Sequence, residues 1–211
     1  MNPPRFPPRL TPWQRAAKRA IDLALAVPAT VLALPLMAVI ALLIKLTSPG
    51  PILFRQERLG ENMRPFKMLK FRTMIAGAEE LQEQVNIVLD NGKRLHKHEN
   101  DPRVTKIGRL LRRWSLDELP QLFNVIRGDM SLVGPRPEMP WVVEQYEPWQ
   151  FERFSVPQGI TGWWQINGRA EKPMHLSTED DIYYIRNYSL LLDIKILLKT
   201  PIAVIKGTGA Y

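Results

Sequence analysis

Two adjacent carboxylates, Asp117 and Glu118, are the side chains whose types and spacing best suit chemistry in this 211-residue chain. They lie in the segment Trp-Ser-Leu-Asp-Glu-Leu-Pro-Gln-Leu at residues 114–122. A strip of five basic residues precedes them, with no acid between positions 102 and 116: Arg103, Lys106, Arg109, Arg112 and Arg113. We expect the cations to hold a polyanionic substrate and one carboxylate to meet a phosphorus atom or a metal ion.

The same residues also have structural interpretations. Ser115 and Glu118 fit a capping box, and Asp117 fits a simple helix N-cap. Pro120 favours Asp117 as the cap, because the proline would then be the third helical residue, where a missing N–H costs nothing. Asp117 would then lie beside unpaired N–H groups, a position that favours anions. The basic strip fits a solvated helix face or a membrane-surface patch equally well.

Arg136 stands between two prolines in the segment Gly-Pro-Arg-Pro at residues 134–137. Each proline fixes its own φ and keeps the preceding residue out of the helical region, so a rigid loop presents the guanidinium. Such a group suits bidentate recognition of phosphate. The sequence has no Walker A loop, no Rossmann glycine fingerprint, no Asp-x-Asp and no His/Cys zinc spacing. Carboxylates and arginines are therefore the residues left for phosphoryl chemistry.

The composition points to anionic partners. The formal net charge is +8 and the sequence pI is about 9.9, which favours nucleic acid, anionic lipid or phosphorylated substrates. The chain has no cysteine, so a disulfide framework and thiolate chemistry are excluded.

Residues 20–44 form an apolar run with a single charge, Asp22, and are long enough to cross a hydrocarbon core that needs about 20 residues. Both flanks are basic, and positive charge marks the cytoplasmic side of a membrane segment. A re-entrant hairpin that enters and leaves by one face fits both flanks. Pro28 and Pro35 supply bends, and Pro35 lies near the middle, where a hairpin apex belongs. A kinked helix that spans the membrane explains the composition equally well.

The rest of the chain predicts short strands and amphipathic helices. Residues 52–54 and 65–71, on either side of a turn at 60–62, predict a β-hairpin. Apolar residues recur at helical spacing between positions 107 and 114, so we expect an amphipathic helix whose other face is the basic strip. The remaining predictions are a polar helix and loop at 76–98, a helix at 118–127 ended by Gly128, a loop at 159–169, and helix over 180–206 broken near Pro201.

Six segments along the chain match one protein family in order. They are Lys-Arg-x-x-Asp at 18–22, Ser-Pro-Gly-Pro at 48–51, Lys-Phe-Arg-Thr-Met at 70–74, Leu-Asp-Glu-Leu-Pro-Gln-Leu-Phe-Asn-Val at 116–125, Gly-Asp-Met-Ser-Leu-Val-Gly-Pro-Arg-Pro at 128–137 and Gly-Ile-Thr-Gly at 159–162. Together they resemble the bacterial sugar transferases, the monotopic phosphoglycosyl transferases that begin glycan assembly on a polyprenol phosphate. The match runs from about Lys18 to Tyr211 and resembles the minimal form, without additional N-terminal transmembrane helices.

The resemblance implies transfer of a phospho-sugar from a UDP-sugar to undecaprenyl phosphate, with release of UMP and a requirement for Mg²⁺. In that family the aspartate of the Asp-Glu pair is the nucleophile on the sugar-bearing phosphate. Asp117 would therefore form the phospho-sugar intermediate and lie near the metal, and Glu118 would complete the catalytic pair. We expect five cations to hold the substrate phosphates: Lys70, Arg72, Arg109, Arg112 and Arg136.

The family's anchor is a re-entrant helix broken at a proline, which corresponds to Pro35 and favours the hairpin. Small members often carry a serine before this proline, but here the residue is Leu34, so a hydroxyl that could satisfy the freed backbone groups is missing. We expect a mainly α fold with a small β-hairpin, a re-entrant membrane helix, interfacial amphipathic helices and a compact cytosolic catalytic domain. The expected divisions are a basic segment at 1–19, the re-entrant hairpin at 20–46 and the cytosolic or interfacial transferase domain at 47–211.

These expectations place the protein at the cytoplasmic face of the bacterial inner membrane, at the first membrane step of exopolysaccharide or glycoconjugate assembly. The expected partners are a UDP-sugar, undecaprenyl phosphate and the membrane; nucleic acid is not expected, and a homodimer stays open. Glucose, galactose and N-acetylhexosamines all remain candidates for the sugar. The alternative is a non-enzymatic, membrane-anchored binder of anionic lipid or nucleic acid. That alternative explains the charge and the anchor but gives no reason for the Asp-Glu pair beside Pro120.

Overall fold

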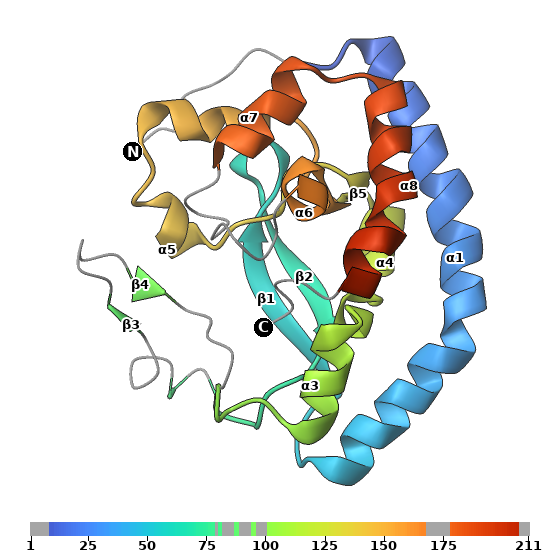
Figure 1. Cartoon of the computed structure of the whole chain (residues 1–211), viewed down its shortest axis with the longest axis vertical. Helices are drawn as coiled ribbons and strands as arrows, with labels where there is room; N and C mark the ends of the chain where they lie inside the picture. Colours follow the sequence, from blue (N-terminus) through green and yellow to red (C-terminus); the bar gives the residue numbers. More distant parts are fainter. Residues whose placement is uncertain are drawn as a thin grey trace.

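The computed structural model describes residues 9–78, 80–81, 87–88, 94–95, 101–167 and 178–206. In this part of the chain, one long helix runs along the side of a small domain of short helices and paired strands (Figure 1). The elements in chain order are α1 (Pro12–Thr47), β1 (Leu53–Leu59), the 3-10 helix η1 (Glu61–Met63), β2 (Pro65–Phe71), β3 (Ile87–Val88), β4 (Arg94–Leu95), α3 (Lys106–Arg113), the 3-10 helix η2 (Leu116–Glu118), α4 (Gln121–Arg127), β5 (Ser131–Val133), α5 (Pro140–Val143), the 3-10 helix η3 (Pro148–Ser155), β6 (Gly159–Thr161), α6 (Trp163–Asn167), α7 (Thr178–Arg186) and α8 (Leu190–Lys206).

The antiparallel hairpin of β1 and β2 lies at the centre of the domain (Figure 1). Leu53 pairs with Phe71 at its open end, and Leu59 pairs with Pro65 beside the turn. The predicted hairpin is therefore confirmed. β2 carries Lys70 near its end and packs against η2 and α4, the elements that follow the basic strip.

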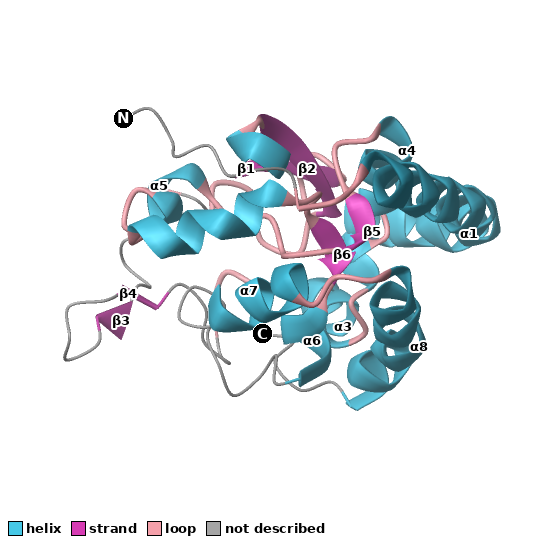
Figure 2. Ribbon diagram, turned by 90° about the horizontal axis from the view of Figure 1, so that it is seen from above, coloured by secondary structure: helices cyan, strands magenta, loops and turns pink. Residues whose placement is uncertain are grey.

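A second, parallel pair of strands holds the loop that contains Arg136. β5 and β6 pair with Ser131 opposite Gly159, and Figure 2 shows this pair between α4 and α6. Just after β5, the Gly134 N–H donates to the carbonyl of Thr161 at 2.9 Å. A Cβ at Gly134 would lie 2.2 Å from the carbonyl oxygen of Pro157, so only glycine allows this close approach.

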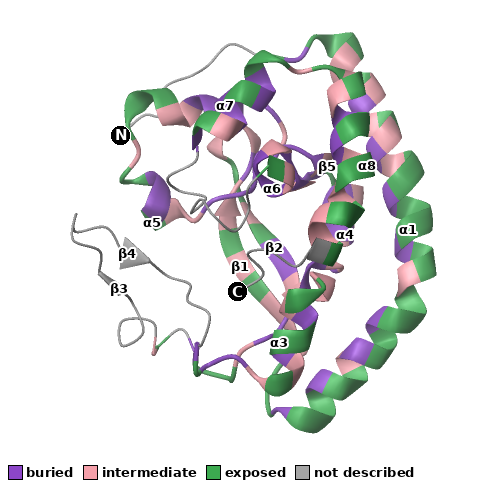
Figure 3. Cartoon of the chain, viewed as in Figure 1, coloured by how far each residue is buried: buried purple, intermediate pink, exposed green. Residues whose placement is uncertain are grey.

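α1 is a continuous helix of 36 residues. It begins with a capping box, in which Thr11 Oγ1 accepts from Gln14 N at 3.2 Å and Thr11 N donates to Gln14 Oε1 at 2.9 Å. One stripe of the helix is buried against the domain, whereas much of the rest exposes apolar side chains, with Leu32 80% exposed (Figure 3). Among the residues that the structure describes, α1 is the one helix long and apolar enough to cross a membrane.

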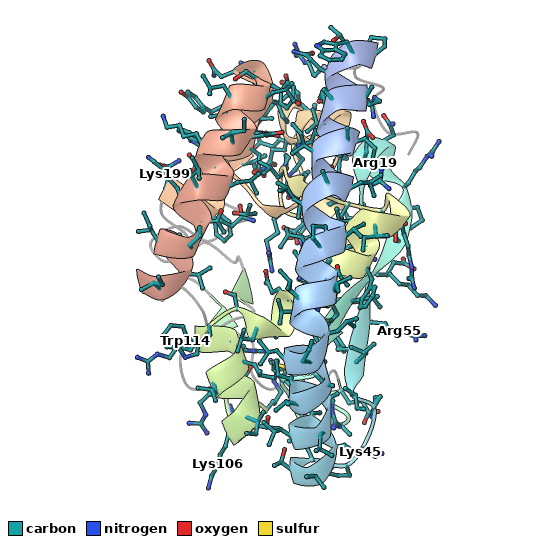
Figure 4. All side chains as sticks on the ribbon, turned by 90° about the vertical axis from the view of Figure 1, so that its right-hand side faces the viewer. Arg19, Lys45, Arg55, Lys106, Trp114 and Lys199 are labelled. Atoms are coloured by element: carbon teal, nitrogen blue, oxygen red, sulfur yellow. The ribbon has the colours of Figure 1, made fainter. Side chains whose placement is uncertain are left out.

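Two charged residues on the buried stripe join α1 to the domain. Lys18 Nζ lies 2.6 Å from Asp193 Oδ2 on α8 and donates to the carbonyl of Val133 at 2.8 Å. Asp22 Oδ1 accepts from the Leu132 N–H at 2.8 Å. Figure 4 shows α1 and α8 side by side, as these contacts require. Because the groups are buried and paired, they fix α1 against β5, the strand that leads to Arg136.

The apolar core of the described residues consists of three clusters, two of which include residues of α1. One joins β5, α7 and α8 around Ile196. A second joins α1, β2 and α4 around Ala26 and Val125. The third joins the C-terminal half of α1 to β2 and α3 around Ile40 and Leu111. α1 therefore supplies part of the core as well as an exposed apolar surface.

Two sequence predictions are wrong in their type of element. At 76–98 the sequence predicts a polar helix and loop, but residues 87–88 and 94–95 form the strands β3 and β4, and most of the other residues in this range lie outside the described ones. The predicted loop at 159–169 contains β6 and α6, and residues 168–169 lie outside the described residues. Strands of two or three residues are too short to show the alternation that reveals a strand in sequence.

The C-terminal helices differ from the prediction in where the helical segment is interrupted. The break expected near Pro201 lies instead at residues 187–189, between α7 and α8, and Pro201 is inside α8. α1 begins at Pro12, within the segment 1–19, and no turn interrupts it at Pro35. Thr30 Oγ1 donates to the Ala26 carbonyl at 2.7 Å, a bond that together with the missing proline N–H groups favours the bowed course of α1 in Figure 1.

Candidate active site

Asp117 and Glu118 lie in η2, a single 3-10 turn between α3 and α4. Ser115, just before this turn, has a left-handed backbone with φ 53° and ψ 22°, which is uncommon for a residue with a side chain. α4 starts at Gln121, directly after Pro120. The prediction that Asp117 caps a helix with Pro120 as its third residue is therefore wrong, because the carboxylates occupy a separate turn. The capping box is also excluded, because Ser115 makes no side-chain cap bond.

Glu118 is the member of the pair that cations hold. Lys70 Nζ donates to Glu118 Oε1 at 3.2 Å. Arg136 binds both carboxylate oxygens, with Nη1 to Oε2 at 3.3 Å and a second bond from Nη2 to Oε1. Burial lowers the pKa of Arg136, but the neighbouring Glu118 outweighs this effect, so the pKa of Arg136 is raised overall. The pKa of Lys70 is lowered, mainly by burial. Glu118 thus fixes two cations, one from β2 and one from the loop after β5.

Asp117 is also buried, with 7% of its surface exposed, but it differs from Glu118 in its partners. In the part of the chain that the structure describes, no hydrogen bond or ion pair reaches its carboxylate. Burial raises its pKa, the charge of Lys70 lowers it, Glu118 raises it further, and Arg112 and Arg136 lower it. An unpaired carboxylate among three cations is available to meet a substrate or a metal ion.

Arg112 and Arg109 lie one turn apart on α3 but have different surroundings. The Arg112 side chain is partly buried, its Nε donates to Thr73 Oγ1 at 3.0 Å, and its charge acts on Asp117. Arg109 is exposed, as is Lys106, which points away from the domain in Figure 4. The structure therefore brings Arg112 to the carboxylates and leaves Arg109 on the outer face of the helix.

Arg72, another predicted phosphate ligand, is occupied elsewhere. Its guanidinium is buried and donates to the carbonyl of Ser48 at 2.8 Å and to that of Pro49. These contacts tie the end of β2 to the loop after α1. Of the five predicted cations, the structure gathers Lys70, Arg112 and Arg136 around Asp117.

Behind Arg136 lies a group of buried ion pairs that sequence analysis missed. Arg153 is wholly buried, donates to the Arg136 carbonyl at 2.8 Å and lies 2.7 Å from Asp181 Oδ2 and 3.8 Å from Glu138 Oε2. Arg58 on β1 binds the same Glu138 at 3.3 Å. These contacts hold the backbone that presents Arg136. The one signal in the sequence was the position of Glu138 directly after Gly-Pro-Arg-Pro, since Arg153 belongs to none of the matched segments.

We expect Arg153→Met to lower stability by about 3–5 kcal/mol, because it leaves buried carboxylates without their cation. The loss should be larger at about pH 8 than at about pH 5. Burial already raises the pKa of Asp181 to about 6, above its ordinary 3.8, so folding takes up a proton and stability falls as pH rises between these values. Removal of Arg153 raises the pKa of Asp181 in the folded protein further, so stability falls over a wider range of pH. Thermal unfolding at both pH values measures the effect.

The matched control is Arg186→Met, because the Arg186 side chain is 61% exposed and pairs with Glu152 at 3.0 Å. This change should leave the melting temperature close to that of the wild type at either pH, because an exposed ion pair contributes little to stability. Equal melting temperatures for the two variants would show that the buried pairs of Arg153 do not hold the Arg136 loop.

From the described residues, a divalent cation would find one unpaired carboxylate at this site, that of Asp117. Mg²⁺ takes oxygen ligands and is often bound by one or two carboxylates together with substrate phosphates. Among the described residues, no cluster of three His, Cys, Asp or Glu forms a metal cage. The donor set therefore fits a Mg²⁺ shared with a phosphorylated substrate, and it does not fit a metal held by protein ligands alone.

Two hollows lie next to the segment that carries the carboxylates, and Glu118 lines the smaller of them. A groove of about 890 Å³ runs between α1, β1 and α4, with mainly apolar walls that include Met37, Phe71 and Phe123. Pro120, two residues after Glu118, also lines it. A smaller cavity of about 220 Å³ has Glu118 and Arg136 in its wall and extends toward α6 and α8.

In the described part of the chain, one membrane-length helix and a buried pair of carboxylates among cations together fit the class of membrane-associated proteins that handle phosphate-bearing substrates. The comparison with known families agrees with this class. A family model described as "Bacterial sugar transferase" matches residues 13–207, and the chain belongs to this family. The resemblance drawn from the six segments is confirmed.

Individual relatives are similar over most of this chain. The chain is 42% identical over 199 residues to a UDP-N-acetylgalactosamine-undecaprenyl-phosphate N-acetylgalactosaminephosphotransferase of Aeromonas hydrophila, covering 92% of this chain and 44% of the relative. It is 42% identical over 217 residues to a UDP-glucose:undecaprenyl-phosphate glucose-1-phosphate transferase of Escherichia coli, covering 99% of this chain and 44% of the relative. It is 39% identical over 199 residues to the exopolysaccharide production protein ExoY of Rhizobium meliloti, covering 92% of this chain and 88% of the relative. The chain thus spans less than half the length of the first two relatives and most of the third.

Proposed function

We propose that this protein transfers a phospho-sugar from a UDP-sugar to undecaprenyl phosphate and releases UMP, as the first membrane step in assembly of an exopolysaccharide or related glycoconjugate. The observation that carries the proposal is the contrast between two neighbouring carboxylates. Within the described residues Asp117 lies unpaired among three cations, whereas two of these cations hold Glu118. The relatives support the substrate classes, because two are named undecaprenyl-phosphate sugar phosphotransferases and one an exopolysaccharide production protein.

In the first half of the proposed reaction, a carboxylate oxygen of Asp117 attacks the phosphorus atom that carries the sugar. A bond forms between these two atoms, the phosphoanhydride bond breaks, and its electron pair leaves with UMP. Lys70, Arg112 and Arg136 meet the charge on the phosphate oxygens, and protein contacts fix all three in advance. The product of this half is an aspartyl phospho-sugar.

In the second half, an oxygen of the acceptor phosphate attacks the same phosphorus atom. The bond to Asp117 breaks, and the carboxylate is regenerated with the electron pair. The apolar groove supports a lipid acceptor, because its walls reach from α1, the membrane-length helix, to Pro120 beside the carboxylates. Transfer to the lipid therefore returns the site to its starting state.

Mg²⁺ is the proposed cofactor, held by Asp117 together with the donor diphosphate. When bound, it neutralises charge on the diphosphate. Glu118 is the positioning member of the pair, because its two oxygens hold Lys70 and Arg136 beside the reacting phosphate.

α1 is the proposed anchor in the bacterial inner membrane, with the domain at the cytoplasmic face. The exposed apolar surface of the helix and the basic residues on both of its flanks support this placement. Pro35 is the proposed site of a re-entrant bend in lipid, because its missing hydrogen bond weakens the helix near the middle of the apolar run.

The re-entrant arrangement predicts that both ends of α1 face the cytoplasm. The chain has no native cysteine, so single cysteines at Asn2 and at Glu57, which is exposed on β1, can be labelled selectively. A membrane-impermeant thiol reagent should label neither position in intact cells and both after permeabilisation. Labelling of position 2 alone from outside would show a spanning helix.

The proposed reaction predicts that the purified protein releases UMP, not UDP, when given undecaprenyl phosphate, Mg²⁺ and a panel of UDP-sugars. The panel contains UDP-glucose, UDP-galactose, UDP-N-acetylglucosamine and UDP-N-acetylgalactosamine, and the nucleotide products are separated by chromatography. UDP as the product would mean direct glycosyl transfer. No nucleotide from any donor, with nuclease-sensitive membrane association, would favour a non-enzymatic binder of anionic lipid or nucleic acid.

A further inference from the structure

The smaller cavity contains a buried polar group that the proposed transfer of the phosphate does not use. Gln165, on α6, lines the cavity and is 8% exposed. Its Nε2 donates to the Ile160 carbonyl at 3.3 Å, whereas its Oε1 is buried and has no hydrogen-bond partner among the described residues. A buried acceptor without a partner carries a desolvation cost, which a ligand that brings a donor removes.

A second acceptor, the hydroxyl oxygen of Thr161, lines the same cavity and is hydrogen-bonded to Thr200. Thr200 on α8 donates its hydroxyl to the Ile196 carbonyl at 2.8 Å. The bond of 2.8 Å between Thr161 and Thr200 must therefore use the Thr161 hydrogen, since Thr200 has only one to give. No other hydrogen bond to Thr161 Oγ1 is found among the residues that the structure describes, so its lone pairs add a second acceptor to this side of the cavity.

The rest of the cavity suits a sugar ring. Its walls include Leu119, Ile160 and Val204, which can pack against the C–H groups of a pyranose, and its volume of about 220 Å³ admits a single small ring. Glu118 and Arg136 lie in the same wall. A sugar joined to a phosphate beside Arg136 would therefore extend into this space.

We propose that this cavity is the sugar subsite and that Gln165 and Thr161 determine which sugar is transferred, by accepting hydrogen bonds from hydroxyl or amide N–H groups of the pyranose. The inference rests on the proposed function, since the pyranose is the one attached to the phosphate that Asp117 would receive. It adds the chemical class of the recognition, which is hydrogen-bond donors on the sugar meeting acceptors on the protein.

The test uses Gln165→Met, which keeps the side-chain volume and removes the acceptor. Steady-state UMP release in the presence of undecaprenyl phosphate and Mg²⁺ is measured for the UDP-sugar that the wild type uses best and for analogues that each lack one hydroxyl. The variant should lose about 10- to 100-fold in kcat/KM for the parent donor. For one analogue, the kcat/KM of the wild type should be lower than for the parent donor by a similar factor. The variant should use that analogue and the parent donor about equally well, because the missing hydroxyl and the substitution remove the same hydrogen bond.

Gln145→Met is the matched control, because Gln145 is exposed on the surface outside the cavity, and its kinetics should equal those of the wild type. If Gln165→Met does not fold, Thr161→Val gives the same comparison at the second acceptor. A folded variant that keeps the wild-type kcat/KM and the wild-type preference among analogues would overturn the sugar subsite while leaving the proposed reaction intact. Absence of UMP with the wild type would defeat the proposed function, and this inference with it.

Discussion

Asp117→Asn is expected to reduce turnover by at least about 10³-fold, because the amide cannot form the acyl phosphate that divides the reaction into two displacements. The substitution is nearly isosteric, and the structure shows no hydrogen bond to the Asp117 carboxylate in the described part of the chain. Burial raises the pKa of this carboxyl, so replacement by a neutral amide should cost little stability. Loss of activity at an unchanged melting temperature would separate chemistry from folding.

The intermediate itself gives the sharper measurement. With UDP-sugar and Mg²⁺ but no lipid acceptor, the wild type should release up to one UMP per active site and gain the mass of a phospho-sugar. Asp117→Asn should do neither, and steady-state kinetics of the wild type should be ping-pong. An adduct that persists in Asp117→Asn would place the nucleophile on another residue, with Glu118 the first to examine.

Arg112→Ala should lower kcat/KM by about 10²- to 10³-fold, because its charge acts on Asp117 and would act on the phosphate that Asp117 attacks. Arg109→Ala, one turn away on the same helix, should change it less than about threefold, because Arg109 is exposed. The two variants remove the same side chain from the same helix, so differences in helix propensity and net charge cancel.

Measurement of UMP release and of lipid-linked product for both variants distinguishes the two positions. Equal, small effects would return Arg112 to the solvated face of the helix. Equal, large effects would instead restore Arg109 as a phosphate ligand and show that the exposed side of α3 closes over the substrate.

Local signals in the sequence determined much of this protein. The membrane-length run, the β1–β2 hairpin and α3 each depend on periodicity or turn residues within a short window, and the structure contains all three. Ser115 shows where that local information ends. Its left-handed backbone creates a separate turn for Asp117 and Glu118, and nothing in the residue type predicts that conformation.

Tertiary contacts alone decided which carboxylate is held and which is available. Lys70 precedes Glu118 by 48 residues and Arg136 follows it by 18, so their meeting depends on how β2 and the loop after β5 pack against η2. The same packing ties Arg72 to the loop after α1 and places Arg153 behind Arg136. The sequence by itself determined the kinds of groups that meet a phosphate, because charge and hydropathy are properties of residue types. Only the tertiary structure assigned their roles, because the partner that neutralises a buried charge comes from another part of the chain.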